Sequence, residues 1–142
     1  MEPIRSQVQD WMTKQPITIS PESSAVEAYE RMRAHKVHRL PVIDPQGHLV
    51  GIITRSDIEG VVSFQRTEQG WHEARFALAG TTVAEVMTGD PITVTATTSM
   101  RQATQLLLDH HLSGLPVVDG TQLVGILSES DVFRMVVRLC DD

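Results

Sequence analysis

Hydrophobic and polar positions follow a pattern that occurs twice along the chain. Apolar residues recur at i, i+3, i+4 and i+7 from Ala25 and again from Met100, with the polar Thr104 as one exception. This spacing predicts two helices with one buried stripe each. A hydroxyl three residues before an acid or amide fits a capping box and predicts where each helix begins. These pairs are Ser24 with Glu27 and Ser99 with Gln102.

Two short apolar runs after each helix predict a pair of strands joined by a tight turn. The first pair covers residues 37–43 and 48–54, and the second pair covers 112–118 and 122–128. The second run of each pair is almost continuously apolar, as in strands covered on both faces. Each copy therefore predicts a β-α-β-β-α unit. The remaining elements are a β-prone piece at 17–19 and 92–94 and a second helix from Ser56 and Ser130.

The two copies also match in sequence. The matching segments are Met12-Thr13 with Met87-Thr88, Pro16-Ile17-Thr18-Ile19 with Pro91-Ile92-Thr93-Val94, 40–44 with 115–119, and 49–57 with 123–131. The offset is 75 residues up to Asp44 and 74 from Leu49, so the second copy has lost one turn residue. We therefore expect two similar units related by approximate twofold symmetry. Units of roughly 60 to 70 residues are marginal alone, so we expect them to share a core.

Repeat 1 is expected to span residues 7–62 and repeat 2 residues 82–139, separated by a segment without a copy at 63–81. We interpret this segment as an extension of the second helix followed by a connector, with breaks at Gly70 and Gly80. Its aromatic residues cover the core or form a self-association surface, and core burial is the more frequent outcome. They are Phe64, Trp71 and Phe76.

Composition and charge narrow the function classes. The 142 residues contain 18 acidic and 12 Lys or Arg residues, and the formal charge of −6 argues against a nucleic acid or an anionic membrane as partner. No apolar run approaches the ~20 residues of a membrane span, and no signal peptide is evident at the N-terminus. The single Cys140 forbids an internal disulfide, so we expect a cytoplasmic protein.

One stretch of repeat 1 departs from this acidic balance. Five basic residues lie within seven positions: Arg33, His35, Lys36, His38 and Arg39. The equivalent stretch of repeat 2, residues 108–114, contains no Lys or Arg. A local basic cluster in an acidic protein suits a small anion better than a polymer. A solvated helix end explains its exposed members equally well.

A hydroxyl–carboxylate pair follows the last strand of each copy: Thr54 with Asp57, and Ser128 with Asp131. This spacing is itself a helix cap, which is the simpler interpretation. A functional interpretation uses the same geometry, because free N–H groups at a helix start favour an anion. There a hydroxyl can bind phosphate, and an Asp can accept hydrogen bonds from two ribose hydroxyls. The spacing favours the cap and leaves both interpretations open.

The order and repetition of these motifs resemble a tandem pair of cystathionine-β-synthase (CBS) domains, also called a Bateman module. The resemblance covers residues 7–62 and 82–139 and rests on Met-Thr-x-x-Pro-Ile-Thr, Leu-Pro-Val-(Ile/Val)-Asp and Gly-Ile-(Ile/Leu)-(Thr/Ser)-x-Ser-Asp, each present twice. It implies an α+β fold of two β-α-β-β-α CBS repeats packed with pseudo-twofold symmetry around two clefts. In this family the clefts commonly bind AMP, ADP, ATP or S-adenosylmethionine, and the modules often form homodimers.

Carried onto this sequence, the resemblance assigns Thr54 to phosphate and Asp57 to ribose. Cleft 1 would be lined by Arg39, Ile52, Thr54, Asp57, Met87, Ile92, Leu112 and Ser113. Cleft 2 would be lined by Met12, Ile17, Val37, His38, Ile126, Ser128 and Asp131. The resemblance also places Arg39 where related nucleotide sensors have a phosphate-binding basic residue. Repeat 2 has Gly114 at the equivalent position, which departs from that pattern. We therefore expect the Asp57 cleft to bind a phosphorylated nucleotide more tightly.

The leading hypothesis is a non-enzymatic module that binds an adenosine-containing ligand and signals to a separate regulated protein. The alternative is a dimerising scaffold with empty clefts, in which the hydroxyl–Asp pairs are only helix caps. An enzyme has little support, because no oriented nucleophile, catalytic motif or Gly-rich phosphate loop is present. The six histidines lack metal-ligand spacing, and no obligatory cofactor is implied. Trp11 and Trp71 are expected to be packing residues.

Overall fold

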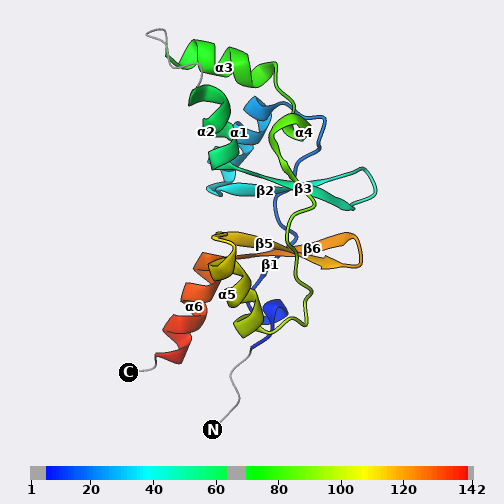
Figure 1. The fold of residues 1–142 in the computed structure, drawn as a ribbon, viewed down its shortest axis with the longest axis vertical. Helices are drawn as coiled ribbons and strands as arrows, with labels where there is room; N and C mark the ends of the chain where they lie inside the picture. The colour runs from blue at the N-terminus through cyan, green and yellow to red at the C-terminus, as the bar shows by residue number, and fades with distance from the viewer. Residues whose placement is uncertain (1–5, 64–69, 141–142) are drawn as a thin grey trace. The chain divides into compact units, whose positions relative to one another are not determined.

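The computed structural model describes residues 6–63 and 70–140, and the chain divides into two compact units (Figure 1). The repeat-1 unit (residues 17–91) contains α1 (Ala25–His35), β2 (Arg39–Ile43), β3 (Leu49–Thr54), α2 (Arg55–Ser63), α3 (Trp71–Ala79), α4 (Val83–Val86) and β4 (Thr88–Gly89). The repeat-2 unit (residues 1–16 and 92–142) contains the short helix η1 (Val8–Asp10), β1 (Thr13–Lys14), α5 (Met100–Asp109), β5 (Gly114–Asp119), β6 (Gln122–Ser128) and α6 (Glu129–Leu139). Within the described ranges, no helix has the length and apolar character needed to cross a membrane.

Each unit contains a three-stranded antiparallel sheet whose short third strand comes from the other repeat. The strand order is β2-β3-β4 in the repeat-1 unit and β1-β6-β5 in the repeat-2 unit. The threonine of each Met-Thr motif therefore pairs with the central strand of the other repeat. This architecture confirms the predicted α+β fold with two similar repeats.

The β-prone pieces at 17–19 and 92–94 form single parallel bridges instead of strands. Ile19 lies opposite Val42, and Val94 lies opposite Val117. The Ile19 N–H donates to the Pro41 carbonyl at 3.1 Å. Each piece thus adds one ladder position to the edge of a hairpin before the chain enters a helix.

The predicted caps and buried stripes of the first helices are present. The Ser24 hydroxyl oxygen accepts the Glu27 N–H at 3.1 Å, and Ser99 accepts the Gln102 N–H at 3.0 Å. The buried positions on α1 and α5 are Ala25, Ala28, Met32, Met100, Ala103 and Leu107, whereas Tyr29 and Thr104 are half-buried. The second helices begin at Arg55 and Glu129, one residue earlier than predicted, because Thr54 and Ser128 occupy the cap positions.

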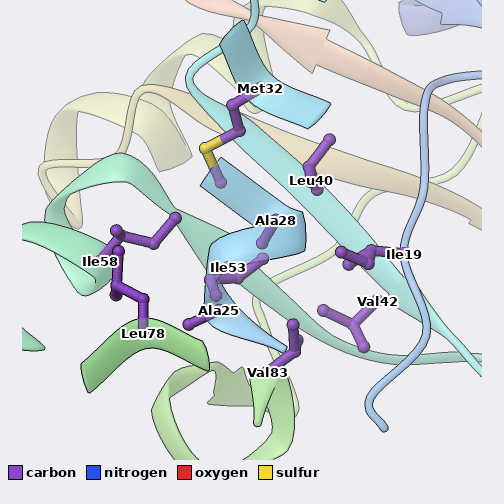
Figure 2. Packing of buried hydrophobic residues seen from close by; sticks show 10 residues of the cluster. All are labelled: Ile19, Ala25, Ala28, Met32, Leu40, Val42, Ile53, Ile58, Leu78 and Val83. Atoms are coloured by element: carbon purple, nitrogen blue, oxygen red, sulfur yellow. The ribbon is translucent and has the colours of Figure 1, made fainter. Parts of the chain in front are cut away.

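The segment without a copy contains a separate helix, α3, instead of only an extension of α2. Gly70 precedes α3 with φ 69°, which breaks the helical path, and Gly80 ends it. Burial of Phe76 in the core is a wrong prediction, because its side chain is 83% exposed. Leu78 is buried in its place and lies next to Ile58 of α2 (Figure 2). Phe64 and the Trp71 side chain lie outside the described residues.

Buried side chains form one cluster within each unit, whereas we expected the repeats to share a single core. The repeat-1 cluster consists of Ile19, Ala25, Ala28, Met32, Leu40, Val42, Ile53, Ile58, Leu78 and Val83 (Figure 2). The repeat-2 cluster consists of Val8, Val94, Met100, Ala103, Leu107, Leu115, Val117 and Leu127. Each cluster includes a valine from the segment that begins the other repeat, Val83 or Val8. Exchanged chain segments therefore complete two cores.

A glycine in each central strand makes room for the exchanged Met-Thr segment. A Cβ atom at Gly51 would lie 2.6 Å from the Met87 sulfur and 2.8 Å from the Thr88 carbonyl oxygen. At Gly125 the same atom would lie 2.7 Å from the Met12 sulfur and 2.9 Å from the Thr13 carbonyl oxygen. A methionine side chain can move, but the backbone oxygen is held by the strand ladder. The sequence requires glycine here because of this close approach.

We expect Gly51→Ala and Gly125→Ala each to lower the free energy of unfolding by about 1–3 kcal/mol, because the added methyl group overpacks the crossing. The matched control is Gly60→Ala in α2, where the new Cβ would meet nothing within 4 Å. That change should stabilise the chain by about 0.5–1 kcal/mol, since alanine favours a helix over glycine. Urea unfolding measures all three. An equal change in the free energy of unfolding at all three glycines would contradict the close approach of the Met-Thr segments to Gly51 and Gly125.

Candidate functional site

A reciprocal hydrogen-bonded pair joins the end of β3 to the start of α2. The Asp57 carboxylate accepts the Thr54 N–H at 2.8 Å, and the Thr54 hydroxyl oxygen accepts the Asp57 N–H at 3.2 Å. The capping interpretation of this pair is therefore confirmed. The cap uses the hydroxyl as an acceptor, so the hydroxyl proton can still be donated to a ligand.

Three further residues predicted for cleft 1 lie in the same unit. Arg39 begins β2 directly opposite Thr54 in the β2–β3 ladder. Ile52 pairs with Thr88, which brings Met87 to the same stretch of β3. The repeat-1 half-site therefore consists of Arg39, Ile52, Thr54, Asp57 and Met87. Ile92, Leu112 and Ser113 belong to the repeat-2 unit, and their part in cleft 1 stays a prediction.

The repeat-2 unit builds the equivalent half-site from Met12, Ile126, Ser128 and Asp131. Thr13 pairs with Ile126, and the Asp131 carboxylate accepts from the Ser128 N–H at 2.9 Å and the Ser128 hydroxyl at 3.2 Å. Asp131 is buried, with 4% of its surface exposed. The remaining residues predicted for cleft 2 are Ile17, Val37 and His38, which belong to the repeat-1 unit. Their part in cleft 2 stays a prediction.

Two side-chain differences distinguish the half-sites. The other oxygen of Asp131 accepts a hydrogen bond from the Arg134 guanidinium at 2.7 Å. The equivalent position in α2 is Gly60, which has no side chain to form such a pair with Asp57. The position opposite the cap hydroxyl is Arg39 in one unit and the buried Gly114 in the other. The repeat-1 half-site therefore has the additional cation, and the repeat-2 carboxylate is already ion-paired.

A pocket of about 250 Å³ lies beside the repeat-1 half-site, between the end of α1 and the start of α2. It is lined by Tyr29, Met32, Arg33, Lys36, Val37, His38 and Arg55. Three members of the predicted basic cluster contribute to this pocket, whereas His35 and Arg39 do not line it. Sequence reasoning missed Tyr29 and Arg55. The signal for Arg55 was available in the comparison of copies, since repeat 2 has Glu129 at that position.

The remaining candidates from the sequence are Trp11, the possible metal ligands and Cys140. Trp11 is half-buried and packs against the repeat-2 cluster, as expected of a packing residue. Across residues 6–63 and 70–140, no three His, Cys, Asp or Glu side chains gather as ligands of a metal ion would. Cys140 is exposed at the end of α6.

Comparison with known proteins gives the same family for both repeats. The family model of the CBS domain matches residues 8–63 and 83–138. A curated relative, the CBS domain-containing protein YhcV of Bacillus subtilis, is 35% identical over 127 residues, which cover 89% of this chain and 83% of the relative. The match therefore extends over most of both chains.

Two solved structures at 30% identity are also similar to this chain. The CBS domain pair of protein MJ0100, in complex with 5-methylthioadenosine and S-adenosyl-L-methionine, has a TM-score of 0.81, with 96% of this chain and 99% of that chain covered. CBSX2 in complex with AMP has a TM-score of 0.80, with 95% and 98% covered. Both were determined with ligands that contain adenosine.

We expect Asp131→Ala to destabilise the chain more than Asp57→Ala, because Asp131 is the more buried carboxylate and accepts from Ser128 and Arg134. Loss of a helix cap costs about 0.5–2 kcal/mol, and Asp131 should lie at the upper end of that range. As a control, Arg134→Ala removes only the exposed partner and should cost no more than about 1 kcal/mol. Urea unfolding gives the order, and a larger loss at Asp57 would contradict this description.

Proposed function

The chain belongs to the CBS domain family, and on that basis we propose that it is a regulatory module that binds an adenine nucleotide. The observation that supports this most directly is the repeat-1 half-site, in which Thr54, Asp57 and Arg39 lie together at a helix start. Relatives at 30% identity were solved with AMP and with S-adenosylmethionine. Arg39 favours the phosphorylated ligand, because a guanidinium–phosphate contact is roughly twice as strong as a neutral hydrogen bond.

The half-site supplies a group for each part of a nucleotide. The Asp57 carboxylate is an acceptor for the two ribose hydroxyls, while the Thr54 hydroxyl and the N-terminus of α2 face the negative phosphate. Ile52 and Met87 are apolar neighbours for the adenine ring. Because the Thr54–Asp57 cap already fixes both side chains, little rotamer freedom remains to be lost on binding. We extend the ligand contacts to Ile92, Leu112 and Ser113, as the family pattern implies.

We also propose that the repeat-2 half-site binds the nucleotide more weakly. Asp131 holds Arg134 at 2.7 Å, so a ribose hydroxyl must displace this pair before it can reach the same oxygen. Gly114 offers no charge to the phosphate. Ligand contacts here are extended to Ile17, Val37 and His38 in the same way.

Asp57→Asn separates ligand binding from capping, because the asparagine amide oxygen can accept the same hydrogen bond from the Thr54 N–H. We expect this variant to keep its melting temperature and to bind AMP about 10- to 100-fold more weakly, since a hydrogen bond to a charged group contributes about 1.5–3 kcal/mol. Asp131→Asn is the matched control and should change AMP affinity less. Isothermal titration calorimetry measures both. Loss of AMP binding in Asp131→Asn with retention in Asp57→Asn would overturn the assignment.

The alternative remains a scaffold that binds no ligand and uses the hydroxyl–Asp pairs only as caps. A thermal-shift series with AMP, ADP, ATP and S-adenosylmethionine distinguishes the two functions. Ligand at 100 times its dissociation constant stabilises the folded state by about 2.7 kcal/mol, which raises the melting temperature. No shift with any of the four ligands would favour the scaffold.

Signalling to a separate regulated protein requires that the ligand bind one conformation better than another.

We further propose that the module forms a homodimer through the exposed face of α5 and α6. The large exposed apolar side chains of these two helices are Leu108, Phe133, Val136, Val137 and Leu139. Phe133, Val136 and Val137 follow helical spacing and therefore lie on one side of α6. Apolar side chains grouped on one side of an exposed helix mark interaction sites more often than single exposed residues do.

Phe133→Glu introduces the residue that repeat 1 has at the equivalent position, Glu59. Because two like charges would meet at a symmetric interface, we expect this variant to be monomeric at concentrations where the native chain is dimeric. Phe76→Glu is the control, since Phe76 is a large exposed apolar residue of the repeat-1 unit. Sedimentation velocity reports the state. A monomeric native chain, or dissociation by Phe76→Glu alone, would contradict the assignment.

A further inference from the structure

The pocket between α1 and α2 combines positive charge with an apolar wall. Its basic residues come from three places: Arg33 from α1, Lys36 and His38 from the segment after α1, and Arg55 from the first position of α2. No acidic residue lines the pocket. The apolar wall consists of Tyr29, Met32 and Val37. The pocket is therefore locally positive, although the chain as a whole has a net charge of −6.

Backbone hydrogen bonds hold these three places together. Lys36 ends α1 in a left-handed conformation, φ 54°, and the Val37 N–H donates to the Met32 carbonyl at 3.0 Å. The Arg55 N–H donates to the His38 carbonyl at 2.8 Å, which ties α2 to the same segment. The Arg33 guanidinium lies 5.9 Å from the centre of the Tyr29 ring. The basic groups are therefore presented by a fixed backbone and not by a loose loop.

The charge of the pocket is not a requirement of the fold. The equivalent positions in repeat 2 are Thr104, Leu107, Leu108, His111, Leu112, Ser113 and Glu129. The same β-α-β-β-α unit thus forms with no Lys or Arg at these positions and with one acidic residue. Arg33, Lys36 and Arg55 bring like charges to one place, and an ion pair with Glu59 at 3.3 Å compensates Arg55 in part. Both side chains of that pair are more than half exposed, so the pair is weak and a bound anion can replace Glu59. The repulsion that remains favours an anion in the pocket.

We propose that this pocket binds a small phosphoanion with two linked phosphate groups. Its volume of about 250 Å³ lies below the ~300–1,000 Å³ of sites for drug-sized ligands, so it suits a pyrophosphate group better than an entire nucleotide. Arg33 and Arg55 offer planar guanidinium groups that bind phosphate oxygens in pairs, and Lys36 adds a mobile point charge. The phosphoanion is either a free molecule or the phosphate chain of a larger ligand. Val37 and His38 are also among the contacts proposed for the repeat-2 cleft, so the test below changes Arg33 and Arg55, which belong to neither proposed nucleotide site.

Titration with inorganic pyrophosphate tests the pocket directly, by calorimetry at low salt and without divalent cations. The variant Arg33→Leu/Arg55→Glu installs the residues of repeat 2, Leu108 and Glu129. We expect it to weaken pyrophosphate binding at least tenfold. The matched control is Arg101→Leu/Arg138→Glu, which makes the same charge change at exposed positions of α5 and α6. The control should stay within twofold of the native chain.

Three outcomes would overturn the proposal. They are the absence of pyrophosphate binding by the native chain, an equal loss in the control variant, and a pocket variant that changes only the oligomeric state. The last outcome would assign the basic surface to a protein contact. Asp57→Asn should bind pyrophosphate as the native chain does, so failure of the nucleotide site and failure of this pocket can be told apart.

Competition identifies the source of the phosphoanion. If ADP displaces pyrophosphate and AMP does not, the pocket holds the phosphate chain of a nucleotide. If AMP and ADP both bind together with pyrophosphate, the pocket holds a separate phosphoanion. Either result supports phosphoanion binding in the pocket, and each shows which kind of molecule carries the phosphate groups.

Discussion

The structure depends on one close approach, in which a Met-Thr segment crosses a glycine in the central strand of the other repeat. Met87 lies over Gly51 and Met12 lies over Gly125, with less space than a methyl group needs. This crossing adds the third strand to each sheet and brings an apolar segment into each core. It also places a methionine beside the strand that ends at the cap hydroxyl. Core packing and the composition of each half-site therefore have the same cause.

In the proposed site, the hydroxyl–Asp pair is both a structural cap and a group that contacts the ligand. The cap satisfies free N–H groups at the helix start and fixes the carboxylate and hydroxyl in position. Duplication kept this geometry in both repeats, whereas the surrounding charges diverged. Repeat 1 has Arg39 and the basic pocket beside its cap, while repeat 2 has Gly114 and an Arg134 ion pair. A duplicated fold has thus become two half-sites of different charge.

Local features of the sequence predicted the local structure well. The cap pairs indicated where helices begin, and the apolar runs indicated both hairpins, because short-range spacing determines these elements. The crossing could not be predicted from spacing: β1 and β4 have two residues each, and Thr13 pairs with Ile126 far along the chain. The expected burial of Phe76 was wrong because Leu78, two positions further along α3, packs into the core instead. The pocket was only half predicted, since Arg55 joins the basic cluster through tertiary structure.

Methionine methyl groups provide the most direct test of the central claim, that the repeat-1 half-site is the preferred nucleotide site. The sequence has six methionines, of which Met87 and Met12 report on the two half-sites and the buried Met100 on a core. In a methyl NMR titration with AMP, the account requires the Met87 signal to shift at lower ligand concentration than the Met12 signal, with Met100 unchanged. If Met12 shifts first, or neither half-site responds while AMP binds, the account is contradicted.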